Sequence, residues 1–93
     1  MEVVYEWNTG KAAANWRRHR VSFEEASTVF LDPLAMTFAD PDHSANEHRE
    51  ITIGHTESRQ IVLVSHCERG NRVRIISARL ATRVERRQYE EGI

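Results

Sequence analysis

Several short hydrophobic segments of this chain are rich in β-branched and aromatic residues, and residues 72–75 also alternate polar and hydrophobic positions, which is typical of β-strands. Alternation or β-branched and aromatic character marks five segments as strands: 3–7, 34–38, 49–54, 60–66 and 72–77. Only a short glycine-containing turn separates the last two segments. We therefore expect these two strands to pair as an antiparallel hairpin.

Three other segments show helix signals. Residues 11–19 include three consecutive alanines and follow a candidate N-cap at Asn8 or Thr9. The sequences Ser22-Phe23-Glu24-Glu25 and Thr82-Arg83-Val84-Glu85 are capping boxes, in which a hydroxyl and a carboxylate satisfy the first backbone amides of a helix. From these two starts we expect helices to about residues 30 and 91.

The element order is therefore β-α-α-β-β-β-β-α in one domain, residues 1–93, which predicts an α+β fold with a mostly antiparallel sheet. If the helices gather on one face of a curved sheet, the other face needs polar cover or a ligand. Arg72 and Arg74 alternate with Val73 and Ile75, so their guanidinium groups should project from that second face.

Basic residues are concentrated toward the end of the chain. The chain has 13 lysine and arginine residues against 14 acidic residues, and Lys11 is the only lysine. Seven arginines lie in the segment 69–87: Arg69, Arg72, Arg74, Arg79, Arg83, Arg86 and Arg87. Arginine binds phosphate or carboxylate through two parallel hydrogen bonds, so the cluster predicts an anion-binding face. A solvated surface would show the same run of charges.

The sequence favours the cytoplasm over export or a membrane. The first residues include an acid and lack the long apolar stretch of a signal peptide. No apolar run approaches the roughly 20 residues that cross a bilayer. The single cysteine, Cys67, has no internal disulfide partner, and we expect it to be a small buried hydrophobic residue in a reducing compartment.

Short motifs along nearly the whole chain resemble those of one protein family, the BrnT family. They are residues 7–11 with Asn15 and His19, residues 21–26, Asp32-Pro33, Asp42-His43, Ile53-Gly54, and residues 74–79 with Glu85 and Tyr89. The stretch 74–79, RIISAR, together with the helix that follows, is the most specific part. Arg20 departs from the family, which commonly has a glycine there, suited to a left-handed helix cap.

The resemblance implies a fold and a function. BrnT proteins are type II toxins with a RelE-like fold, and they are ribonucleases that shut down translation. The implied substrate is mRNA, free or ribosome-associated. The implied partner is a BrnA antitoxin with a ribbon-helix-helix DNA-binding module, so that DNA is contacted only through the antitoxin complex.

The chemistry of RNA cleavage indicates which residues to examine. Without a metal or other cofactor, the ribose 2′-hydroxyl is the nucleophile, and the enzyme orients the phosphate, transfers protons and stabilises negative charge. Arg79 is the first candidate for charge stabilisation, and Arg83, near a helix N-terminus, is the second. The alternative for Arg79 is an ion pair with Glu85 or a C-terminal acid.

Five further basic residues are candidates for substrate binding: Lys11, Arg49, Arg72, Arg74 and Arg86. Each also has a purely structural interpretation. Lys11 can be ordinary helix surface, and Arg49 can pair with Glu47 or Glu50.

Proton transfer is assigned to His43 and Glu47, with His48 and His66 as further candidates. Glu47 would need burial or a nearby charge to raise its pKa. The loop 40–48 also suggests a metal site, but its spacing is not that of a helical His-Glu-x-x-His motif, so we expect none. His66 and Cys67 are adjacent in a strand and point to opposite sides, which makes them a poor zinc pair.

Two function classes without catalysis remain open. One is a nucleic-acid-binding module, although the pI near 6.5 is low for a duplex-binding domain and no RNP-type stacking motif is present. The other is a protein-interaction module whose arginine face binds an acidic chain. RNA cleavage by the purified chain distinguishes the enzyme from both.

Overall fold

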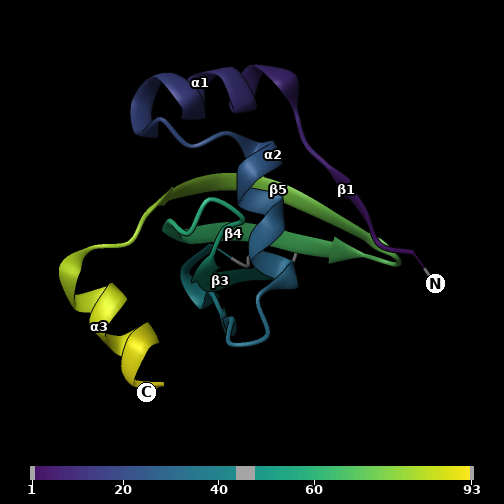
Figure 1. The fold of residues 1–93 in the computed structure, drawn as a ribbon. Coiled ribbons are helices and arrows are strands. Elements are labelled where there is room, and N and C mark those ends of the chain that lie inside the picture. Colours follow the sequence, from purple (N-terminus) through teal and green to yellow (C-terminus); the bar gives the residue numbers. More distant parts are fainter. Residues whose placement is uncertain (1, 44–47, 93) are drawn as a thin grey trace.

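The structure, a computed structural model, describes residues 2–43 and 48–92 and contains a five-stranded sheet (Figure 1). The strands are β1 (Val4–Glu6), β2 (Met36–Ala39), β3 (Arg49–His55), β4 (Ile61–Arg69) and β5 (Arg72–Leu80). Their order in the sheet is β1-β5-β4-β3-β2. All pairs are antiparallel except β1 with β5, so the expected α+β fold with a mostly antiparallel sheet is confirmed.

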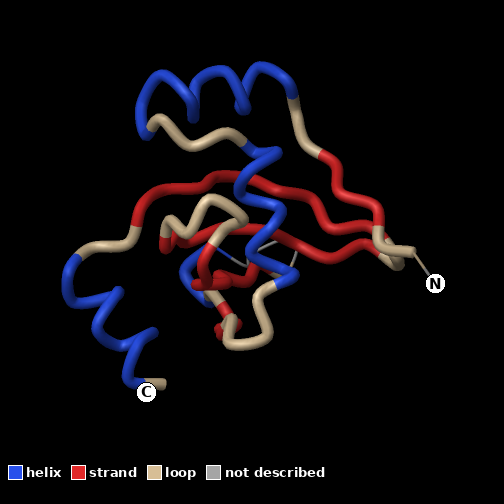
Figure 2. The backbone as a smooth tube through the Cα atoms, in the orientation of Figure 1, coloured by secondary structure: helices blue, strands red, loops and turns tan. Residues whose placement is uncertain are grey.

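The helices lie on one side and at two edges of this sheet (Figure 2). They are α1 (Thr9–His19), α2 (Phe23–Ser27), the 3₁₀ turns η1 (Thr28–Leu31) and η2 (Pro41–His43), and α3 (Arg83–Glu91). In Figure 1, α2 crosses one face of the sheet, α1 lies beyond the β5 edge, and α3 extends from the end of β5. Among residues 2–43 and 48–92, no helix packs across the second sheet face.

The hydrophobic core lies between α2 with η1 and the sheet. Its fully buried residues are Val21, Phe23, Ala26, Val29, Val62, Val64, Ile75 and Ala78. Aromatic contacts extend this core, because Tyr5 stacks on Phe30 at 5.4 Å between ring centroids and Trp7 meets Phe23 edge-on at 5.9 Å. Burial of this shared apolar surface holds the helices to one face of the sheet.

A β-bulge in the hairpin of β4 and β5 decides which side chains share the second face. Ser65 pairs with Ser77, but His66 pairs with Ile75, so Ile76 is the extra residue. Ile75 and Ala78 are therefore both buried although they are three positions apart. By the same shift, Arg74 and Arg79 both lie on the second face, whereas an unbroken strand would point them to opposite sides.

The three α-helices begin after the N-cap residues predicted from the sequence, but the second helix differs from its prediction in two ways. Asn8 caps α1, Ser22 caps α2, and Thr82 caps α3 with a complete capping box. The second helix ends as an α-helix at Ser27 and continues only as a 3₁₀ turn. Its capping box is half formed, because the Glu25 carboxylate accepts hydrogen bonds from the Thr56 and Ser58 hydroxyls and not from the Ser22 amide.

Arg20 ends α1 in the left-handed conformation that the family's glycine suggests. Its φ is 57° and its backbone N–H donates to the Trp16 carbonyl. Its guanidinium carbon lies 5.6 Å from the centroid of the Trp16 ring. The local cost of a left-handed arginine is thus met by a cation–π contact one turn back.

Candidate functional site

Arg79 lies on the second face of the sheet and is held there by a carboxylate of α3. Its Nη1 and Nη2 donate to the two carboxylate oxygens of Glu85 at 2.8 Å and 2.9 Å. The hydrogen bonds from Arg79 lower the pKa of Glu85 to about 2, and the same bonds raise the pKa of Arg79. The ion pair offered as the alternative for Arg79 is therefore present, and it orients the guanidinium with its side chain still 42% exposed.

A hollow of about 90 Å³ lies beside Arg79 on this face. Its lining consists of His19, Ile51, Leu63, Ser65, Ser77, Ala78 and Arg79. The hollow thus places an imidazole, a guanidinium and two hydroxyls around a small open space. Such a set can hold a phosphate and move a proton.

Asn15 explains why His19 reaches this hollow. Its buried side chain donates to the carbonyls of Val21 and Ala78 at 2.9 Å and 2.8 Å, and it accepts from the Ala78 amide at 3.0 Å. These bonds fix α1 to the strand residue that precedes Arg79. His19, one helical turn after Asn15, is carried to the rim of the hollow.

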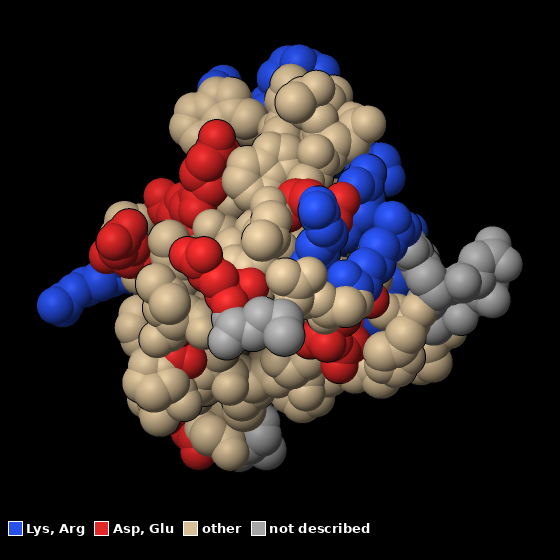
Figure 3. All heavy atoms as spheres, turned by 90° about the vertical axis from the view of Figure 1, so that its right-hand side faces the viewer, with Lys and Arg blue, Asp and Glu red and all other residues tan. Residues whose placement is uncertain are grey.

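Three predicted substrate-binding arginines lie on the same face, toward the end of the sheet that holds the β4–β5 turn. They are Arg49, Arg72 and Arg74. Arg74 donates to Glu6 at 3.1 Å, and Arg72 is 3.9 Å from the same carboxylate. Arg49 begins β3 in register with Cys67, which in turn pairs with Arg74. Figure 3, which views the molecule from this end, shows a group of basic side chains right of centre, with acidic side chains among and below them and further acidic side chains to the left.

Arg83, the second candidate for charge stabilisation, and the predicted binding residues Arg86 and Lys11 do not line the hollow. Arg83 and Arg86 are exposed on α3, and Arg86 borders a separate surface depression with Arg59 and Leu80. Lys11 is exposed in the first turn of α1, where its backbone amide donates to the cap residue Asn8.

The predicted proton-transfer residues are only partly covered by the structure. His43 ends η2, and its side chain is outside the described part of the chain, as is the whole of Glu47. His48 is exposed, 3.9 Å from Glu50. Their roles stay predictions.

His66 is a core residue and does not face the hollow. It is 2% exposed on the helix-covered side, with Nε2 2.7 Å from the Thr52 hydroxyl. Burial lowers its pKa. Cys67 is buried at 1% exposure, so its predicted burial is confirmed.

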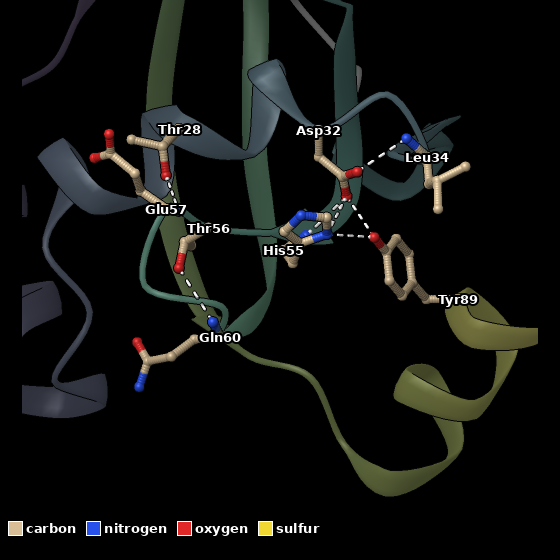
Figure 4. A network of polar contacts seen from close by, with 8 residues as sticks. All are labelled: Thr28, Asp32, Leu34, His55, Thr56, Glu57, Gln60 and Tyr89. Atoms are coloured by element: carbon tan, nitrogen blue, oxygen red, sulfur yellow. Dashed lines mark hydrogen bonds and ion pairs between the residues drawn. The ribbon is translucent and has the colours of Figure 1, made fainter.

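Asp32, His55 and Tyr89 form a polar cluster that the sequence pattern does not predict (Figure 4). The Asp32 Oδ2 accepts from the Tyr89 hydroxyl at 2.5 Å and from the His55 amide at 3.0 Å, and His55 Nδ1 lies 2.7 Å from the Tyr89 oxygen. Asp32 and Tyr89 were noted only as family motifs. Asp32, His55 and Tyr89 are too far apart along the chain for a sequence motif to predict their contact.

The pKa values of Asp32 and Tyr89 are both shifted by the hydrogen bond between them. Burial alone would raise the pKa of Asp32, but hydrogen bonds from Tyr89, His55 and Leu34 outweigh it and lower the pKa. Burial and the bond to Asp32 raise the pKa of Tyr89 to about 12. Gly54 makes room for the carboxylate, because a Cβ there would lie 3.1 Å from Asp32 Oδ2.

Since α3 has no buried residue, its attachment to the sheet in the described part of the chain rests on polar contacts. Glu85 binds Arg79 at the start of the helix, and Tyr89 binds Asp32 near its end. The hollow beside Arg79 and the cluster around Asp32 are thus linked through one helix.

Comparison with known proteins identifies the family. A family model described as the ribonuclease toxin BrnT of type II toxin-antitoxin systems matches residues 7–85. The chain belongs to the BrnT family. The resemblance seen in the sequence motifs is therefore confirmed, and with it a ribonuclease toxin whose substrate is RNA and whose partner is a cognate antitoxin.

A solved structure supports the fold. The crystal structure of the Brucella abortus ribonuclease toxin BrnT superposes with a TM-score of 0.66 over 89% of this chain and 99% of that chain, at 22% sequence identity. No curated protein matched the chain significantly by sequence.

No helix in residues 2–43 and 48–92 is long and apolar enough to cross a membrane. Within the same ranges, no three His, Cys, Asp or Glu side chains are grouped closely enough to hold a metal ion.

Proposed function

We propose that this BrnT-family ribonuclease cleaves RNA in the hollow beside Arg79, by attack of the ribose 2′-hydroxyl and without a metal ion. The observation that carries the proposal is that Arg79 and His19, from distant parts of the chain, line one hollow on the sheet face that no helix of the described residues crosses. The guanidinium would bind the scissile phosphate, and the imidazole would accept the proton of the attacking hydroxyl.

The proposed cleavage step uses Arg79, His19 and one further group that donates a proton to the leaving oxygen. The 2′-oxygen forms a bond to phosphorus as its proton passes to His19, negative charge accumulates opposite Arg79, and the bond to the 5′-oxygen breaks. The leaving oxygen takes a proton from a group on the other side of the phosphate, because the displacement is in line. His43 and Glu47 are our predictions for that donor. Arg83, which does not line the hollow, is our prediction for a contact with a neighbouring phosphate of the RNA. The products are a 2′,3′-cyclic phosphate and a 5′-hydroxyl.

The biological consequence that fits this chemistry is inhibition of translation by cleavage of mRNA in the cytoplasm. We propose a BrnA-like antitoxin with a ribbon-helix-helix domain as the partner. Acidic side chains of such an antitoxin would bind Arg72, Arg74 and Arg79 and exclude phosphate from the same face.

Cleavage in the presence of a chelator tests this mechanism. Purified protein is incubated with single-stranded RNA in excess EDTA, and the 3′ ends are analysed for cyclic phosphate. We expect full cleavage and cyclic-phosphate ends. Activity that EDTA abolishes and zinc or magnesium restores would refute metal-independent cleavage. A chain that binds RNA or an acidic partner without cleaving would support the interaction-module alternatives.

A further inference from the structure

The surface next to His19 carries an exposed tryptophan and an arginine that have no role in the proposed cleavage step. Trp16 is 48% exposed, and the guanidinium of Arg20 lies over its ring at 5.6 Å. Residues three and four apart on a helix are neighbours, about 5–6 Å between Cβ atoms, so Trp16 adjoins both His19 and Arg20. The Trp16–Arg20 pair is therefore continuous with the rim of the hollow.

The charge of α1 favours a polyanion at this place. Residues 9–20 contain Lys11, Arg17, Arg18, Arg20 and no acidic side chain. Cations in the last turn also stabilise the negative end of the helix dipole, which accounts for part of the pattern. The helix dipole explains part of the positive charge but not the exposure of Trp16, whose apolar ring is left partly in water beneath the Arg20 guanidinium.

We propose that the Trp16–Arg20 pair is a stacking subsite for a base of single-stranded RNA that flanks the phosphate bound at Arg79. An aromatic ring and a guanidinium plane both stack on nucleobases of any sequence, and the positive charge attracts the adjoining backbone. The subsite rests on the proposed function for its place beside the cleavage site. It would select for single strands, because a paired base is not free to stack on a side chain.

Tryptophan fluorescence reports directly on the subsite. The chain has two tryptophans, and the other, Trp7, packs against Phe23. The probe is a fully 2′-O-methylated single-stranded oligonucleotide, which lacks the hydroxyl nucleophile and so is not cleaved. We expect this oligonucleotide to quench the fluorescence of wild-type protein and to leave that of Trp16→Phe nearly unchanged. We also expect Trp16→Ala to bind it about 5- to 150-fold more weakly, the usual effect of losing one stacked aromatic.

Arg20→Gly separates binding from folding. Glycine adopts the left-handed conformation of residue 20 without strain, so the melting temperature should equal or exceed that of wild type while oligonucleotide affinity falls. Arg18→Ala is the matched control. It removes the same charge from the same turn, but residue 18 projects roughly 160° around the helix from Trp16, so affinity should change little.

The outcomes separate this subsite from the cleavage mechanism. Absence of quenching in wild type, or a Trp16→Ala protein that binds the probe as tightly as wild type, would overturn the subsite even if RNA is cleaved in EDTA. Trp16 quenching in a protein that cleaves no RNA would instead refute the proposed catalysis and leave the subsite standing.

Discussion

The guanidinium of Arg79 and the carboxylate of Glu85 form two parallel hydrogen bonds across the junction between β5 and α3. A third donor hydrogen is directed to the Leu80 carbonyl at 3.3 Å. Because a guanidinium has five N–H donors, three used here leave two for a ligand. Glu85 therefore orients Arg79 without consuming its capacity to bind a phosphate.

Removing the Arg79 guanidinium should separate catalysis from binding. We expect Arg79→Ala to lower the cleavage rate by about 10²–10³, the usual effect of losing one preorganised donor to transition-state charge. Arg79→Lys should recover only part of the rate, because it keeps the charge but loses the fork. Single-turnover cleavage of RNA measures the rates.

Arg86→Ala is the control for Arg79, since it removes an exposed arginine of α3 away from the hollow. It should mainly weaken RNA binding and reduce its salt dependence. Thermal melting of all three variants shows whether they are folded. A folded Arg79→Ala protein that cleaves as fast as wild type would make the Arg79–Glu85 pair purely structural.

Glu85 should make the protein sensitive to acid. Its pKa is about 2 in the folded protein against an ordinary value of 4.5. The unfolded chain therefore binds the proton more readily, so the stabilisation is complete above about pH 4.5 and is lost as the pH falls toward 2. Because the pair is partly exposed, we expect on the order of 1 kcal/mol.

Glu85→Gln should flatten this part of the stability–pH curve, measured by urea unfolding at a series of pH values. Glu90→Gln, an exposed carboxylate of the same helix, is the matched control and should leave the curve as it is. An unchanged slope in Glu85→Gln would show that the pair contributes nothing to the acid sensitivity.

Tyr89→Phe should loosen α3 without disturbing the core. The change removes the hydroxyl that donates to the buried Asp32 carboxylate, and a hydrogen bond to a charged group is worth about 1.5–3 kcal/mol. We expect a lower free energy of unfolding and faster amide exchange in residues 83–91, measured by hydrogen exchange. Gln88→Ala, the exposed neighbour, should change neither. Full protection of α3 in Tyr89→Phe would mean that the Arg79–Glu85 pair suffices to hold the helix.

Toxicity tests the proposed inhibition of translation. Induction of this protein alone in a bacterial host should arrest growth and protein synthesis, measured by incorporation of labelled amino acid. Co-expression with its cognate antitoxin should restore both. The Arg79→Ala protein, produced at the same level, should be tolerated. Normal growth with abundant folded wild-type protein would argue against translation as the target.

Local sequence determined most of the elements. The capping residues Asn8, Ser22 and Thr82 lie where the three helices begin, because a cap acts on amides within its own turn. The short turn before Arg72 produces the expected hairpin. The motifs spread along the chain also indicated the family correctly, since the family model matches residues 7–85.

Tertiary structure decided which of these residues meet. The bulge opposite Ser65 and His66 turned Arg74 and Arg79 to one face, and Asn15 brought His19 to the same hollow. The cluster of Asp32, His55 and Tyr89 likewise joins three elements. Hydrophobic periodicity and helix caps can be predicted from the sequence, because both depend on residues only a few positions apart. It does not record register shifts or buried polar contacts between distant segments, because those depend on how the sheet pairs and what the core buries.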